Sequence, residues 1–211
     1  LAFGDPVFRR SSSPSSAPST RARSKSLQSL RRSPLLPGTS SLDAAVMLRS
    51  MDWPQLRYSR LETKLASRHF GAYTTQVLLG RDASERRLRE LNRSGELARF
   101  KHLLFSTHGF SDPALPEYAS VVLAGDDDDP LSDGLITMEE WLSLRLNSDL
   151  TLLSACSTAI GKVVNGDGLV GLSYALFVAG NANTIATLWP VSDRETAHFV
   201  DRFFTHIKGG L

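Results

Sequence analysis

The sequence contains a single cysteine among its 211 residues, so no disulfide can form within the chain. A lone cysteine with histidines elsewhere fits a reducing compartment, and we expect a cytoplasmic location. No apolar run approaches the roughly 18 to 20 residues that cross a bilayer, so no membrane association is expected. The glycines between Gly161 and Gly171 lack the lysine and Ser/Thr of a phosphate-binding loop. Nothing in the sequence calls for a cofactor.

The sequence also lacks a strong excess of one charge, since 24 basic and 22 acidic residues give a formal net charge of +2. The isoelectric point near 8.9 reflects arginines gathered in the first third of the chain, which by itself does not argue for nucleic acid. Hydrophobic residues make up 41% of the chain, as in a globular domain. The length suits one domain over residues 1–211. Because Leu1 lies in an apolar, strand-like start, we expect a fragment of a longer protein.

Two segments stand apart from this globular pattern. Residues 9–34 are dominated by serine, arginine and proline and cannot bury enough apolar surface to offset the entropy of ordering. A disordered surface insertion is predicted there, and a nucleic-acid-binding or phosphorylated segment is the less favoured alternative. Residues Asp126 to Asp129 are four consecutive acids. Calcium loops alternate their ligands around a glycine turn, so a solvated loop is favoured and no metal site is predicted.

Strand-like apolar runs alternate with helical patterns along the rest of the chain. Strands are predicted over residues 74–79, 101–109, 121–124, 150–158 and 183–188. Helices are predicted over residues 59–70, 83–91, 167–179 and from Ser192 through Phe204, and a capping box of Thr137 and Glu140 starts another. Turns are predicted at residues 4–6 and 131–136. This order favours an α/β fold with a mostly parallel sheet and helices on both faces.

His108 and Cys156 are the most informative residues, because each ends an apolar run that reads as a buried parallel strand. Chemistry in open α/β sheets collects beyond the carboxyl ends of the strands. If the two strands are neighbours, the imidazole and the thiol meet there, and an adjacent base activates a cysteine nucleophile. The alternative is a small buried cysteine and a structural histidine. The sequence does not decide whether Trp141 packs in the core or lines the rim of the cleft.

Three motifs, in order, resemble the CHAT domain, a caspase-like cysteine peptidase domain often found behind tetratricopeptide repeats. They are Ser106–Gly109, Leu153–Thr158 and Leu188–Asp193. Weaker matches are Gly4–Pro6, Leu36–Gly38 with Glu62, Leu78–Gly80 with Ala83, Asp133–Thr137 and Gly166–Leu172. The histidine of caspases also lies about 50 residues upstream of the cysteine. The resemblance implies a caspase-like three-layer sandwich and a repeat or sensor region upstream.

The resemblance further implies a cysteine endopeptidase with a dyad of His108 and Cys156 and a protein or peptide substrate. The backbone N–H groups of Gly109 and Cys156 would form an oxyanion hole. Trp189, Asp193 and Ser154 would line the substrate pocket. Asp193 could meet a basic side chain, or it could act only as an acid in the first turn of a helix. Many family members carry glutamate after the cysteine, whereas this chain has Ser157. A catalytically silent interaction module is the alternative function.

Overall fold

The fold was analysed in a computed structural model of the chain. The structure describes residues 1–8, 51–110, 118–126, 128–129, 132–159, 167–187 and 191–209, without the side chains of 155–159, 167–170 and 208–209. The predicted insertion at residues 9–34 lies outside these ranges. None of the helices among the described residues combines the length and the apolar composition needed to cross a bilayer.

Five parallel strands form the centre of one seven-stranded sheet. In spatial order they are β2 (Val77–Gly80), β1 (Ala2–Pro6), β3 (His102–Phe110), β6 (Leu150–Ala159) and β7 (Thr184–Ala186). Two antiparallel strands extend the sheet: β4 (Ser120–Val122) pairs with the carboxyl end of β3, and β5 (Leu135–Thr137) pairs with β4. The long strand β3 therefore has β6 along one side, with β1 and then β4 along the other.

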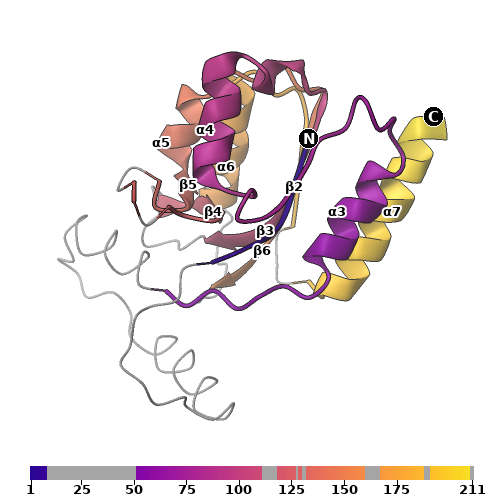
Figure 1. Ribbon diagram of the computed structural model, residues 1–211, viewed down its shortest axis with the longest axis horizontal. Helices are drawn as coiled ribbons and strands as arrows, with labels where there is room; N and C mark the ends of the chain where they lie inside the picture. Colours follow the sequence, from indigo (N-terminus) through magenta and orange to yellow (C-terminus); the bar gives the residue numbers. More distant parts are fainter. Residues whose placement is uncertain are drawn as a thin grey trace, which may run out of the picture.

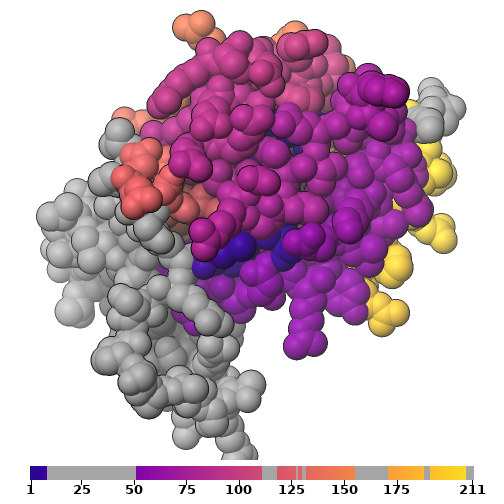
Figure 2. Space-filling model, in the orientation of Figure 1, coloured from indigo at the N-terminus to yellow at the C-terminus, as the bar shows by residue number. Residues whose placement is uncertain are grey.

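Helices cover both faces of the sheet, which gives three layers (Figure 1). One layer holds α4 (Glu85–Ser94), α5 (Met138–Ser143) and α6 (Asp167–Val178), and the other holds α3 (Ser59–Ser67) and α7 (Asp193–Gly209). A 3-10 turn at Leu97–Arg99 precedes β3. In Figure 2 the yellow surface of α7 borders the purple surface around α3. These layers confirm the predicted α/β three-layer architecture.

Local sequence signals explain where several helices start and end. The Ser84 hydroxyl accepts a hydrogen bond from Arg87 N–H and so caps α4. Thr137 and Glu140 form the predicted capping box of α5. Gly180 follows α6 with a φ of +105°, a conformation that favours glycine. Helix α7 begins directly after Ser192, whose carbonyl accepts from Thr196 N–H.

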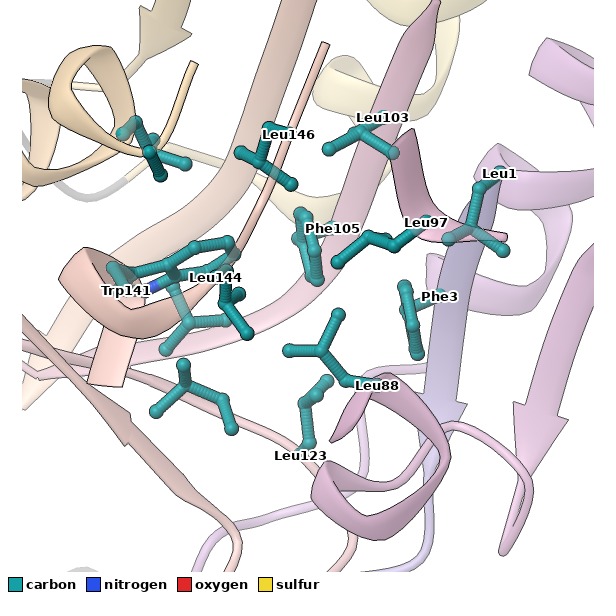
Figure 3. Packing of buried hydrophobic residues seen from close by; sticks show 14 of the residues in the cluster. Leu1, Phe3, Leu88, Leu97, Leu103, Phe105, Leu123, Trp141, Leu144 and Leu146 are labelled. Atoms are coloured by element: carbon teal, nitrogen blue, oxygen red, sulfur yellow. The ribbon is translucent and has the colours of Figure 1, made fainter. Parts of the chain in front are cut away.

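The largest of three apolar clusters among the described residues lies between the sheet and the α4–α5–α6 layer (Figure 3). Phe105 stacks on Phe3 at 4.9 Å between ring centroids and meets the edge of Trp141 at 5.2 Å. Trp141 is completely buried, which assigns it to the core. The predicted inner-face residues of α4, Leu88 and Leu91, are buried in the same cluster.

The second apolar cluster fills the α3–α7 side of the sheet. Leu104 of β3 and Leu152 of β6 contribute to it from the sheet, and Ala66 and Phe204 contribute from the two helices. Side chains alternate between the faces of a strand. The face of Leu104 therefore continues two and four residues later in Ser106 and His108, which places these polar residues on the α3–α7 side.

Two local predictions were wrong. The strand β1 continues to Pro6 through the predicted turn, because the chain absorbs the turn residues as an irregularity in which Asp5 has a φ of +50°. Residues 135–137 form the edge strand β5 and not a continuous turn, since β4 supplies a partner. The predicted helix over residues 59–70 is present as α3, in which Leu61 is exposed and Glu62 is buried.

Candidate active site

The parallel register of β3 and β6 places His108 directly beside Cys156. Leu104 pairs with Leu152, Ser106 with Ser154 and His108 with Cys156, and the two strands stay in step until a register shift after Gly109. Residues far apart in the sequence thus become direct neighbours. The side chain of Cys156 lies outside the described residues, and the backbone register is the observation that joins the pair.

The imidazole of His108 is enclosed by aromatic rings and held by a backbone carbonyl. Its exposed fraction is only 1%. The rings of Phe8 and Trp53 lie 5.1 Å and 5.4 Å from it, measured between centroids. The carbonyl oxygen of Pro54 lies 2.6 Å from Nε2. A carbonyl only accepts, so Nε2 carries the proton in this hydrogen bond. The Pro54 carbonyl therefore gives the imidazole of His108 a defined orientation.

Burial sets the protonation of His108. Loss of water lowers the pKa of its imidazole below the usual 6.5, while the Pro54 carbonyl and the negative charge of Asp193 raise it in part. Neutral imidazole is thus the favoured form near neutral pH, as a group that takes up a proton requires. Asp193 reaches this environment from α7, on the opposite side of the site from β3.

Gly109 lies inside the sheet, at the end of β3. Val121 of β4 pairs with it on one side and Ser157 of β6 on the other. Gly109 therefore has a register partner on each side within the sheet. The predicted oxyanion role of Gly109 and Cys156 stays a prediction.

The structure describes two of the three residues predicted to line the pocket. Asp193 starts α7, as the helix-start alternative expects, and its Oδ2 accepts a hydrogen bond of 2.7 Å from Tyr58 N–H. The carboxylate thereby also ties α7 to the start of α3. Ser154 is 6% exposed on β6, two residues before Cys156. Trp189 lies outside the described residues.

Two contributors to the site were missed in the sequence. The Pro54 carbonyl is a backbone group, which every residue possesses, so no side-chain pattern marks it. Glu62 is a carboxyl group with an exposed fraction of 1% on α3, and hydrogen bonds link it to Ser154 and Ser106. A single charged residue in an amphipathic helix normally faces water, and its burial becomes visible only with the fold.

The fold and the paired strand ends define the class of protein as caspase-like. The CHAT domain family matches residues 7–211, and the chain belongs to that family. Tetratricopeptide repeat protein 28 of Mus musculus is 38% identical over 93 residues, 44% of this chain and 4% of the relative. The Homo sapiens protein of the same name is 30% identical over 82 residues, 39% of this chain and 3% of the relative. The matched segments are thus small parts of these relatives.

Proposed function

We propose that this domain is a cysteine endopeptidase in which Cys156 is the nucleophile and His108 the acid–base partner. The register pairing of these residues at the carboxyl ends of β3 and β6 is the observation that carries the proposal. Support also comes from Ser154, which shares its face of β6 with position 156 by strand alternation. His108 lies on the α3–α7 face of β3, and its register partner, position 156, lies on the matching face of β6.

The proposed reaction uses the orientation of His108. Because Nε2–H donates to Pro54, Nδ1 is the nitrogen that takes the thiol proton. The thiolate attacks the peptide carbonyl carbon, and the imidazolium returns the proton to the leaving amine as the C–N bond breaks. Water then attacks the thioester, gives its proton to Nδ1, and the proton passes to sulfur as the acid product leaves. Pro54 acts as a positioning group throughout.

Cleavage by purified variants tests this function. Cys156→Ala should abolish hydrolysis of a protein substrate, and His108→Ala should lower it by about 10²-fold or more, the range of general acid–base contributions. His206→Ala is a matched control, because His206 lies near the carboxyl end of α7, more than three turns after Asp193 at the start of the same helix. Retained cleavage in a Cys156→Ala preparation would refute the proposal.

A catalytically silent interaction module is the second candidate. The 1% exposure of His108 and the enclosed position of Gly109 favour it, because a polypeptide substrate must reach both. A thiol-reactive peptide distinguishes the candidates. Labelling of Cys156 that depends on His108 supports catalysis, whereas labelling no faster than that of a free thiol supports the module.

We further propose that residues 1–211 act as one effector domain of a larger cytoplasmic protein with a repeat or sensor region upstream. The tetratricopeptide repeats in the names of both relatives support the repeat region. The single cysteine supports the reducing compartment. Coexpression of the domain with such a repeat region, followed by copurification, tests the association.

A further inference from the structure

Glu62 is a buried acid for which the proposed reaction has no use. It projects from α3 to Ser106 and Ser154, the register pair that lies two residues before His108 and Cys156. Its Oε1 is buried with no hydrogen-bond partner among the described residues. Loss of water raises the pKa of Glu62 to about 8, and the negative charge of Asp193 adds to that rise. The fold thus holds an acid with unused bonding capacity beside the proposed dyad.

A second buried acid shows what Glu62 lacks. Glu85 on α4 is fully buried, and burial raises its pKa to about 8 as well. Arg89 reaches its Oε1 at 2.6 Å, and Gly134 N–H donates to its Oε2 at 2.7 Å. Among the described residues, no lysine or arginine forms an ion pair with Glu62. Glu62 has hydrogen bonds to Ser106 and Ser154 but, among the described residues, no cation. A buried carboxylate is costly to ionise without a cation, so Glu62 is suited to one supplied from outside the chain.

We infer that Glu62 determines substrate specificity by receiving the lysine or arginine side chain that precedes the scissile bond. The inference rests on the proposed peptidase function. Ser106 and Ser154 hydroxyls flank the carboxylate, and Asp193 contributes a second negative charge from α7. The cation would bind the unpaired Oε1, while the serines hold the other oxygen.

The depth of Glu62 below the strand ends selects a long side chain. Ser106 and Ser154 lie two residues before the dyad, and two residues of strand span about 6.6 Å. A substrate residue at the level of Cys156 reaches the carboxyl only through an extended side chain. Lysine and arginine combine that length with the required charge, and their apolar stems can pass along buried apolar surface while the charged group reaches the carboxyl.

Affinity labels test the inference without requiring turnover. Two peptidyl acyloxymethyl ketones that differ only in arginine or its neutral isostere citrulline are reacted with the chain, and modification of Cys156 is followed by mass spectrometry. The wild type should prefer arginine by about 100-fold or more. Glu62→Gln should reduce that preference to about tenfold or less, mainly through weaker binding, with little change in the citrulline rate. Ser154→Ala should lower the preference severalfold.

Glu85→Gln is the matched control, since it neutralises an equally buried acid on the other face of the sheet. It should leave the arginine preference unchanged. The inference is overturned by a wild type without arginine preference, or by a preference that survives Glu62→Gln or, where that variant does not fold, Ser154→Ala. Equal loss toward both labels would show a structural role instead. Absence of any His108-dependent labelling would refute the proposed peptidase itself.

Discussion

The carbonyl oxygen of Pro54 lies 2.6 Å from Nε2 of His108, and the ring of Trp53 packs beside the same imidazole. A backbone group thus takes the orienting position that a carboxylate fills in many hydrolases. The segment before α3 is therefore part of the proposed machinery, although it lies in sequence far from both members of the dyad.

Trp53→Ala should reduce the rate at which Cys156 reacts with a peptidyl label by about tenfold to 100-fold. The loss of the indole frees the segment that holds the Pro54 carbonyl, and misplacement by about 1 Å costs up to 10²-fold. Label incorporation measures the effect. Phe199→Ala removes an aromatic ring that is 53% exposed on α7 and should leave the rate unchanged. Equal rates for wild type and Trp53→Ala would contradict the positioning role.

Glu62 should make the folded state less stable as the pH rises. Its pKa is about 8 in the fold and near 4.5 when exposed, so the folded state holds more protons between these values and stability declines across that window. The pKa of His108 is lowered in the fold, so its titration affects stability only below about pH 6.5, where stability rises with pH. Urea unfolding at pH 6.5 and pH 8 compares wild type with Glu62→Gln. The variant should show a smaller decline than wild type. Glu85 contributes to the decline in both proteins, and the Leu1 amine, whose pKa burial lowers to about 5, opposes it in both. An unchanged decline would show that Glu62 is ionised throughout.

Trp141 should stabilise the fold through its ring and not through its indole N–H. The side chain is fully buried, and its Nε1 has no hydrogen-bond partner among the described residues. Trp141→Ala should cost about 3 to 5 kcal/mol in the free energy of unfolding. Trp141→Phe keeps much of the contact with Phe105 and removes the unpaired donor, so it should cost clearly less. Denaturant titration gives both values, and equal costs would point to an essential bond of the indole N–H.

Periodic features of the fold were predictable from the sequence. The alternation of strands and helices, the Thr137–Glu140 capping box and the buried pair Leu88 and Leu91 all follow from local patterns. The same is true of the two strands that end at His108 and Cys156, because continuous apolar runs are typical of buried parallel strands.

The rest of the site depends on contacts that local patterns do not encode. On α3 the charged Glu62 is buried and the apolar Leu61 is exposed, the reverse of what their residue types alone would suggest. The Pro54 carbonyl carries no side-chain signal. Strand β5 forms because β4 pairs with it. The turn-rich sequence before β5 gives no sign of this pairing.

The most direct test of the paired site is the pH dependence of Cys156 alkylation by iodoacetamide. The account predicts a reactive thiolate in wild type well below pH 8, and a return in His108→Ala to the profile of a free thiol with a pKa near 8.5. At pH 6.5 the two rates should differ by about tenfold or more. Superimposable profiles for the two proteins would contradict the claim that His108 and Cys156 act together.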